Sequence, residues 1–108
     1  MITEVFNGYT IRVGRNRKEN DKIVQESKPM DVWLHLSAHP SGHAVISNPD
    51  GTKVPNTVIK RGCTLVKIYS KYSHLKGILC DVAYMKSLLT TPYEGLVDVR
   101  TVIKTIAI

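Results

Sequence analysis

Two short apolar runs decide the fold: DVWLHL at residues 31–36 and SGHAVI at residues 41–46, joined by a connection that contains a proline. Alternation along the first run places its three aliphatic residues on one face of a strand and Trp33 and His35 on the other. The short connection favours antiparallel pairing, so we expect His35 and His43 to lie on neighbouring strands and to face the same side of one sheet. An aromatic beside an imidazole makes that side either half-buried core or a binding surface.

Further elements are predicted on both sides of these runs. Asn7-Gly8 is a strong two-residue hairpin signal, and Asn16 followed by Glu19 predicts a capped helix. Two helices among six or seven strands, joined mostly by short turns, predict an α+β domain: a single small domain over residues 1–108 with a mostly antiparallel sheet. The expected strands span residues 3–6, 9–13, 32–36, 43–47, 78–85, 96–99 and 102–106, and the expected helices span residues 17–26 and 55–72.

Composition sets bounds on the class of protein. The hydrophobic fraction of 43% predicts a real core rather than disorder. No apolar run approaches the length of a membrane span, and residues 1–9 lack the layout of a signal peptide, so we expect a cytoplasmic protein with no membrane partner. Cys63 and Cys80 are expected as reduced core thiols, with a disulfide as the alternative.

The charge distribution points to a polyanionic partner. Fifteen Lys and Arg residues against nine Asp and Glu give a net charge of +6. On the second expected helix, three lysines fall within about 40° of one another, and Gly62 on the opposite side suggests close packing against the sheet. The alternative to a binding surface is an ordinary solvent-exposed row of lysines with no partner. We name two sets: the lysine ridge (Lys60, Lys67 and Lys71) and the N-terminal basic group (Arg12, Arg15, Arg17 and Lys18).

The histidines raise a metal and an enzymatic hypothesis. His35, His39 and His43 are spaced by four residues, but the sequence between the last two breaks any helix that would align them, and no acidic or Cys partner accompanies them. We therefore expect no metal and no cofactor. Asp31 and His35 could pair, yet no nucleophile elbow or P-loop is present. A non-enzymatic protein is predicted, with a small nuclease or hydrolase using Asp31 and the histidines as the rival. His35 and His43 are also expected to gain charge as the pH falls, so the affinity for anions should rise between about pH 7.5 and 6.

Five motifs, in the right order along nearly the whole chain, resemble the NFACT-R domain. This domain occurs in the NFACT proteins of ribosome-associated quality control and in smaller relatives. The motifs are VGRN at residues 13–16 with END at 19–21, DVWLHL at 31–36, PSGHAVI at 40–46, IYSK at 68–71 and GLVDV at 95–99. By motif, the resemblance extends to Gly14, Arg15, Asn16, Asn20, Asp21, Asp31, Trp33, His35, His43, Ser70 and Lys71.

The resemblance implies an RNA-binding domain that contacts tRNA or ribosomal RNA, in a translation or ribosome quality-control context, without catalysis of its own. The sequence does not contain the N-terminal domain, helix-hairpin-helix or coiled coil of full-length members, so their tRNA selection and subunit bridging are not implied. A related coiled-coil protein has been linked to DNA, which keeps DNA as an alternative partner. A protein-interaction adaptor, docking on a ribosomal assembly, is a third.

The candidate nucleic-acid-binding residues combine the two basic sets with the aromatic and histidine positions. Cationic groups would hold phosphates, and Trp33 would either support the histidines or stack a base. Asp21 and Asp31 are expected to fix turns and helix ends. The complete candidate set is Arg12, Arg15, Asn16, Arg17, Lys18, Trp33, His35, His39, His43, Lys60, Lys67, Ser70 and Lys71.

Overall fold

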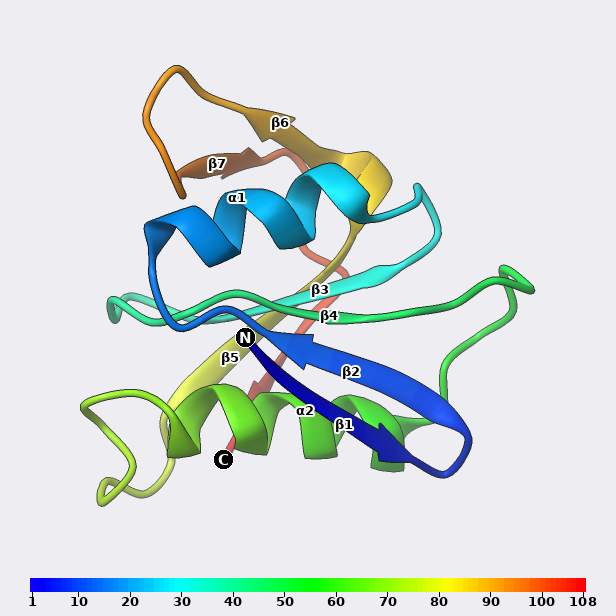
Figure 1. Ribbon diagram of the computed structural model, residues 1–108. Helices are drawn as coiled ribbons and strands as arrows, with labels where there is room; N and C mark the ends of the chain where they lie inside the picture. The colour runs from blue at the N-terminus through cyan, green and yellow to red at the C-terminus, as the bar shows by residue number, and fades with distance from the viewer.

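A six-stranded antiparallel sheet, in the order β1-β2-β4-β3-β5-β8, forms the middle of the computed structural model, which describes residues 1–108 (Figure 1). A separate two-stranded sheet pairs β6 with β7. The elements are β1 (Ile2–Phe6), β2 (Tyr9–Val13), α1 (Arg17–Glu26), β3 (Val32–Leu36), β4 (Ala44–Ile46), α2 (Asn56–Ile68), β5 (Leu79–Tyr84), the 3-10 turn η1 (Met85–Ser87), β6 (Leu88–Thr90), β7 (Val97–Val99) and β8 (Lys104–Ala107). The predicted α+β class, with two helices and a mostly antiparallel sheet, is confirmed.

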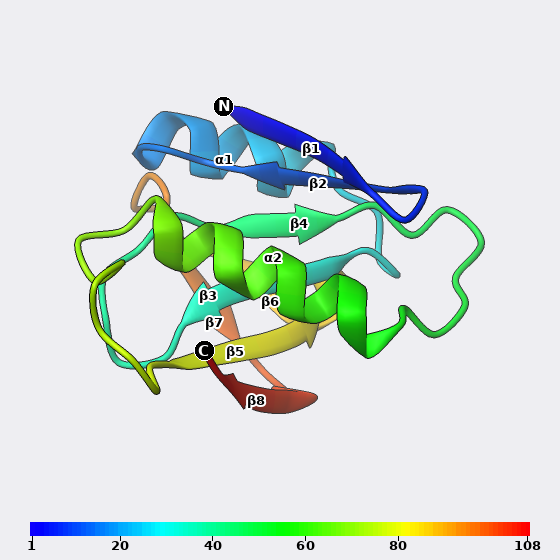
Figure 2. The ribbon, with the colours of Figure 1, turned by 90° about the horizontal axis from the view of Figure 1, so that it is seen from below.

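The two faces of the large sheet are covered differently. α2 packs on one face, and α1 together with the β6–β7 hairpin covers the other (Figures 1 and 2). The core divides accordingly: the aliphatic residues of β3 belong to the larger cluster that includes α2, whereas Trp33 belongs to a smaller cluster with Ile23 of α1. The predicted alternation along β3 is confirmed, so the Trp33 and His35 side faces α1 and the hairpin.

Close packing of α2 on the sheet depends on Gly62. A Cβ atom added at this position would lie 2.4 Å from Leu34 Cδ1, and Leu34 is fully buried. No real side chain tolerates such an approach without movement of its neighbour. The prediction from sequence, that a glycine inside this helix marks close contact with the sheet, is confirmed.

The start of α1 has the predicted cap. The Asn16 side-chain oxygen accepts a hydrogen bond from the Glu19 backbone N–H at 2.9 Å. The Glu19 carboxylate reaches back to the backbone N–H of Arg15, one residue before the partner of an ordinary capping box, and also accepts from the N-terminal amine. Asn16 therefore has a structural role that holds the first turn of α1 in place.

Most predicted boundaries hold to within one residue, and three differences are larger. α2 ends at Ile68, not at residue 72, because the Ser70 hydroxyl donates to the Lys67 carbonyl and accepts from the Tyr72 N–H, which turns the chain out of the helix. β6, which pairs with β7 across a short connection, was not predicted. The last strand begins at Lys104, two residues later than predicted.

Four further expectations concern single side chains and the membrane. Asp31 accepts from the backbone N–H groups of Lys28 and Asn48, which confirms its role in fixing turns. Asp21 accepts from the Gly95 N–H and ties α1 to the β6–β7 connection. Both cysteines are free and buried. No helix combines the length and apolar character that a membrane crossing requires.

Candidate nucleic-acid interface

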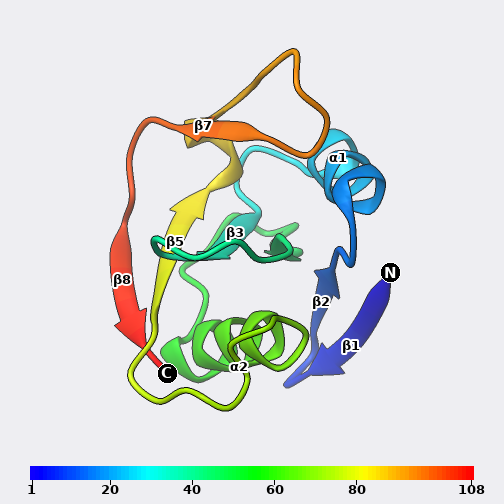
Figure 3. The same ribbon diagram turned by 90° about the vertical axis from the view of Figure 1, so that its left-hand side faces the viewer.

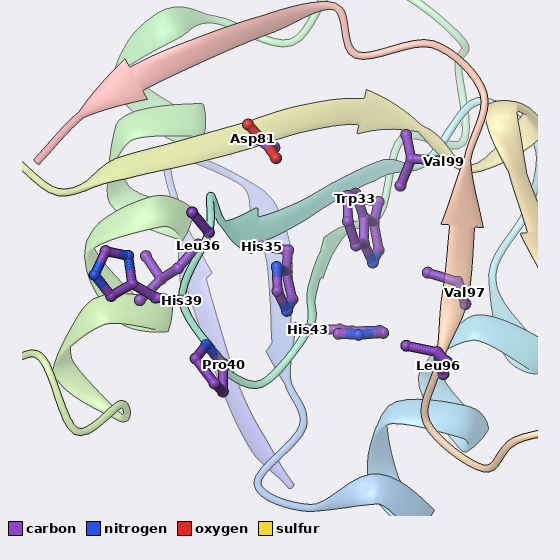
Figure 4. Close-up of a pocket in the computed structure, with 11 residues that line it drawn as sticks. Trp33, His35, Leu36, His39, Pro40, His43, Asp81, Leu96, Val97 and Val99 are labelled. Carbon is purple, nitrogen blue, oxygen red and sulfur yellow. The ribbon is translucent and has the colours of Figure 1, made fainter.

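Three rings from β3 and the start of β4 form one cluster. The His35 ring stacks parallel to Trp33, with the ring centres 5.5 Å apart, and the His43 ring stands edge-on to both, 5.2 Å from His35 and 5.5 Å from Trp33 (Figure 4). His43 directly precedes β4, whose antiparallel register with β3 brings it opposite His35. The prediction that these two histidines lie side by side on one face is confirmed.

His39 is oriented away from this cluster. Its Nδ1 atom lies 3.0 Å from the Ser37 carbonyl oxygen, and its ring contacts Tyr72, in the segment after α2, with ring centres 4.6 Å apart. The four-residue spacing therefore brings two of the three imidazoles together and turns the third toward another part of the fold. No group of three or more His, Cys, Asp or Glu residues is arranged to hold a metal ion.

A cleft of about 460 Å³ opens over the ring cluster. Trp33, His35 and His43 form its sheet side, and Leu96, Val97 and Val99 close it from the β7 side (Figure 4). It shares His35, Pro40, His43 and Leu96 with an adjoining hollow of about 470 Å³, which is lined by residues from the start of α1 and from the β6–β7 connection. We call the two together the histidine cleft. Its size falls in the range of about 300–1,000 Å³ typical of ligand sites.

Burial disfavours the charged form of both imidazoles in this cleft. It lowers the pKa of His35, and it lowers the pKa of His43 to about 4, with the neighbouring His35 adding to the effect and Asp21 opposing it. The prediction that both histidines gain charge between about pH 7.5 and 6 is therefore wrong for His43. The physical reason is that β7 covers its ring, which the sequence pattern did not reveal.

The N-terminal basic group separates into two kinds of residue. Arg12 pairs with Glu26 at 3.2 Å and Arg15 pairs with Glu19 at 3.0 Å, so both guanidinium groups already have carboxylate partners. Arg17 and Lys18, in the first turn of α1, are exposed and make no ion pair. Arg17 also lines the histidine cleft. The structure therefore leaves the second pair of cations free for an external anion.

The lysine ridge lies on the α2 side of the sheet, opposite the histidine cleft. Lys60 is exposed in the middle of α2, and Lys71 is exposed in the segment that follows the helix. Lys67 is half-buried, and its ammonium group donates to the Ile108 carbonyl oxygen at 3.1 Å. Ser70 shapes the end of α2 through its hydroxyl, as described above. The ridge thus begins on the helix and continues beyond it.

The free cations at the start of α1 and the end of the ridge share one end of the domain. The start of α1, the β3–β4 connection and the segment after α2 all face the viewer in Figure 3. The contact between His39 and Tyr72 joins the last two of these segments directly. We call this region, with Arg17, Lys18 and Lys71, the basic end.

Sequence reasoning missed the β6–β7 connection as part of the site. Tyr93 is 70% exposed and Leu96 is 54% exposed, and both line the histidine cleft. The available signal was an aromatic inside residues 91–95, which contain a proline and a glycine and lie between the expected strands at 78–85 and 96–99. A large exposed aromatic in a loop is a common contact for unpaired bases.

Comparison with known proteins gives one family match and several relatives of partial length. The profile of the family described as "NFACT protein RNA binding domain" matches residues 2–91. Coiled-coil domain-containing protein 25 is 27% identical in Danio rerio over 85 residues, which are 63% of this chain and 41% of that protein, and 31% identical in Mus musculus over 65 residues, 57% and 31% respectively. The chain therefore matches less than half the length of these relatives.

A solved structure gives the same fold. The C-terminal part of the fibronectin/fibrinogen-binding protein from Streptococcus suis superposes with a TM-score of 0.85 at 25% identity. The match covers 98% of this chain and 43% of that one. The β6–β7 hairpin and β8 are thus within the shared fold, although the family profile stops at residue 91.

Proposed function

The chain belongs to the NFACT RNA-binding domain family, and we propose on that premise that it is a non-enzymatic domain that binds structured RNA through its basic end. The observation that carries the proposal is the pair of free cations, Arg17 and Lys18, at the start of α1 beside the histidine cleft. The RNA is tRNA or ribosomal RNA, and the setting is cytoplasmic translation or ribosome quality control.

Phosphate contacts explain how the surface would work. The positive end of the α1 dipole adds to the charges of Arg17 and Lys18, and the net charge of +6 steers RNA toward the domain over longer distances. Lys71 extends the cationic surface across the same end. Such contacts fix position and supply affinity but carry little sequence information.

The nuclease alternative named Asp31 and the histidines as its residues, and the structure does not bring Asp31 to the ring cluster. Asp31 precedes β3, and its two carboxylate oxygens accept from the backbone N–H groups of Lys28 and Asn48. Four residues of extended chain, about 13 Å, separate it from His35. An acid and an imidazole at that separation do not form one catalytic centre, so the non-enzymatic hypothesis has the stronger support.

A salt titration tests the proposal. The dissociation constant for labelled tRNA is measured by fluorescence anisotropy in rising KCl, beside an RNA hairpin and a DNA duplex of matched length. If about four phosphates are neutralised, log K should fall with log salt at a slope of about −3 for single strands or −4 for duplexes. No binding at low salt, or a flat affinity, would refute RNA binding.

Further measurements separate RNA binding from the nuclease and DNA alternatives and test the translation setting. The RNA is recovered from the titration with Mg²⁺ and run on a denaturing gel, where intact RNA is expected and cleavage would restore the nuclease hypothesis. Equal affinity for the DNA duplex would favour the DNA alternative. Sedimentation with purified ribosomes tests the translation setting, with co-sedimentation that weakens in high salt as the expected result.

A further inference from the structure

Two polar atoms in the wall of the histidine cleft have no hydrogen-bond partner. Trp33 Nε1 and His43 Nδ1 are both unpaired, although each residue is only 4% exposed. Figure 4 shows the nitrogen-bearing edge of Trp33 turned toward His43, whose ring meets it edge to face. A contact with a ring is much weaker than a hydrogen bond to oxygen or nitrogen. Both nitrogen atoms are themselves shielded from solvent, so pairing them requires a small rotation of rings that line the cleft. Because buried polar groups are nearly always paired in folded proteins, these two atoms mark the wall as one that a polar ligand would stabilise.

The chemistry of the inner cleft selects among ligands. Its sheet side carries three aromatic rings and the Asp81 carboxylate, which lies opposite His35 on β5, and its β7 side is aliphatic. Burial lowers the pKa of both histidines and so favours the neutral imidazole, which offers one donor and one acceptor. An anion gains nothing from such a wall, whereas a flat, uncharged ring with donors and acceptors along its edge fits it.

The rim differs from the interior. The adjoining hollow is lined by the cation Arg17, by Ser41, and by the exposed Tyr93 and Glu94 of the β6–β7 connection. A rim that offers a cation and an exposed aromatic, beside an interior walled by aromatic rings, matches the two parts of a nucleotide: a phosphate outside, at Arg17, and a base inside.

We propose that the histidine cleft captures one unpaired nucleobase of a bound RNA, which continues the parallel stack of Trp33 and His35 while Arg17 holds an adjacent phosphate. This inference rests on the proposed RNA binding and adds a recognition element to it. The domain would accordingly prefer RNA with a bulged or looped-out nucleotide over a perfect duplex of the same charge.

Three RNA hairpins test the proposal. The first carries a single bulged nucleotide, the second carries an abasic nucleotide at the same place, and the third is fully paired. Base–aromatic contacts predict that the bulged RNA binds about tenfold more tightly than the abasic one, although both have the same backbone charge at the bulge. Trp33 is the only tryptophan, so its emission reports on the cleft directly and should change with the bulged RNA alone.

Two variants locate the effect. His43→Phe keeps a ring of similar shape and removes an unpaired polar atom from the core, and Leu96→Glu places a charge at an exposed position on the rim. Each should bring the ratio of bulged to abasic affinity close to one, and taking the ratio cancels the general repulsion of RNA by the new glutamate. His74→Phe is the matched control, because His74 is exposed and does not line the cleft, and it should keep the tenfold ratio.

The outcomes separate the two proposals. Tight, salt-dependent binding with equal affinity for all three hairpins would overturn base capture and leave RNA binding intact. Binding to none of them would overturn both. If His43→Phe does not fold, Leu96→Glu decides, and an unchanged ratio in that folded variant would place the base elsewhere.

Discussion

Neutralising the two free cations at the start of α1 is the sharpest test of where RNA binds. The double substitution Arg17→Gln and Lys18→Gln removes two charges that have no carboxylate partner in the fold. Gln has nearly the same helix propensity as Arg and Lys, and positive charges in a first helical turn oppose the helix dipole. We therefore expect the melting temperature to stay within a few degrees of the original value.

The loss of affinity follows from counterion release. Each phosphate contact contributes about 0.7 to 0.9 to the slope of log K against log salt, so losing two contacts should flatten the slope by about 1.4 to 1.8. Between 1 M and 0.15 M salt, the logarithm of the salt concentration falls by about 0.8. The same two contacts are then worth about 15- to 30-fold in the dissociation constant at 0.15 M salt. Fluorescence anisotropy with labelled tRNA measures both quantities.

The matched control removes the same number of positive charges near the C-terminal end of α1. Lys28 follows α1 and Lys86 lies in η1, both are exposed, and neither lines the histidine cleft. Lys28→Gln with Lys86→Gln should change the affinity only through the net charge, by much less than the first pair. Equal effects of the two double variants on affinity and slope would show that the location of charge does not matter and would refute the basic end as the interface.

Three other perturbations have defined outcomes. Changing all three residues of the lysine ridge to Gln should weaken RNA binding while the melting temperature moves by only a few degrees; an unchanged affinity would mean the ridge is a solvated surface. Gly62→Ala should lower the free energy of unfolding in urea by about 1 kcal/mol or more, because the new methyl group overlaps a buried leucine, whereas Thr57→Ala on the exposed side of α2 should change it by less than about 0.5. The folded protein holds the pKa of His43 near 4, so the unfolded chain binds that proton more tightly and stability should fall, by up to about 3 kcal/mol, as the pH drops from about 6.5 toward 4. His43→Phe should flatten that part of the stability curve, and a curve unchanged by the substitution would contradict the buried, neutral imidazole.

Features that depend on neighbouring residues could be predicted from the sequence. The Asn7-Gly8 hairpin has both residues at positive φ, as its turn type requires, and the Asn16 cap forms as expected. Alternation along β3 correctly separated Trp33 from the aliphatic face. The end of α2 failed because helical periodicity continues past residue 68, while the Ser70 hydroxyl stops the helix through two hydrogen bonds that periodicity does not encode.

Features that depend on distant segments could not be predicted. The pairing of Arg12 with Glu26 joins β2 to α1, and it removes from the candidate interface a cation that looks free in the sequence. The hydrogen bond from Gly95 to Asp21 ties the β6–β7 connection to α1, which places Tyr93 and Leu96 at the histidine cleft. No local sequence pattern signals either contact. The prediction therefore counted too many arginines as free to bind RNA, and it did not include the β6–β7 hairpin in the site.

The covering of His43 by this hairpin also changes what the histidines can do. Exposed imidazoles would gain charge as the pH falls and would add to phosphate binding, as the sequence alone suggested. Under the β6–β7 hairpin the pKa of His43 is lowered to about 4, so the cost of charging this ring is part of folding stability rather than of RNA affinity. Affinity for RNA should accordingly vary little between pH 7.5 and 6, even though stability declines below that range. Measuring RNA affinity and folding stability across this pH range, on the same preparation, tests whether two parts of the domain bind two parts of the RNA. In that arrangement the cations of the basic end contact the phosphates, and the rings of the histidine cleft contact the base.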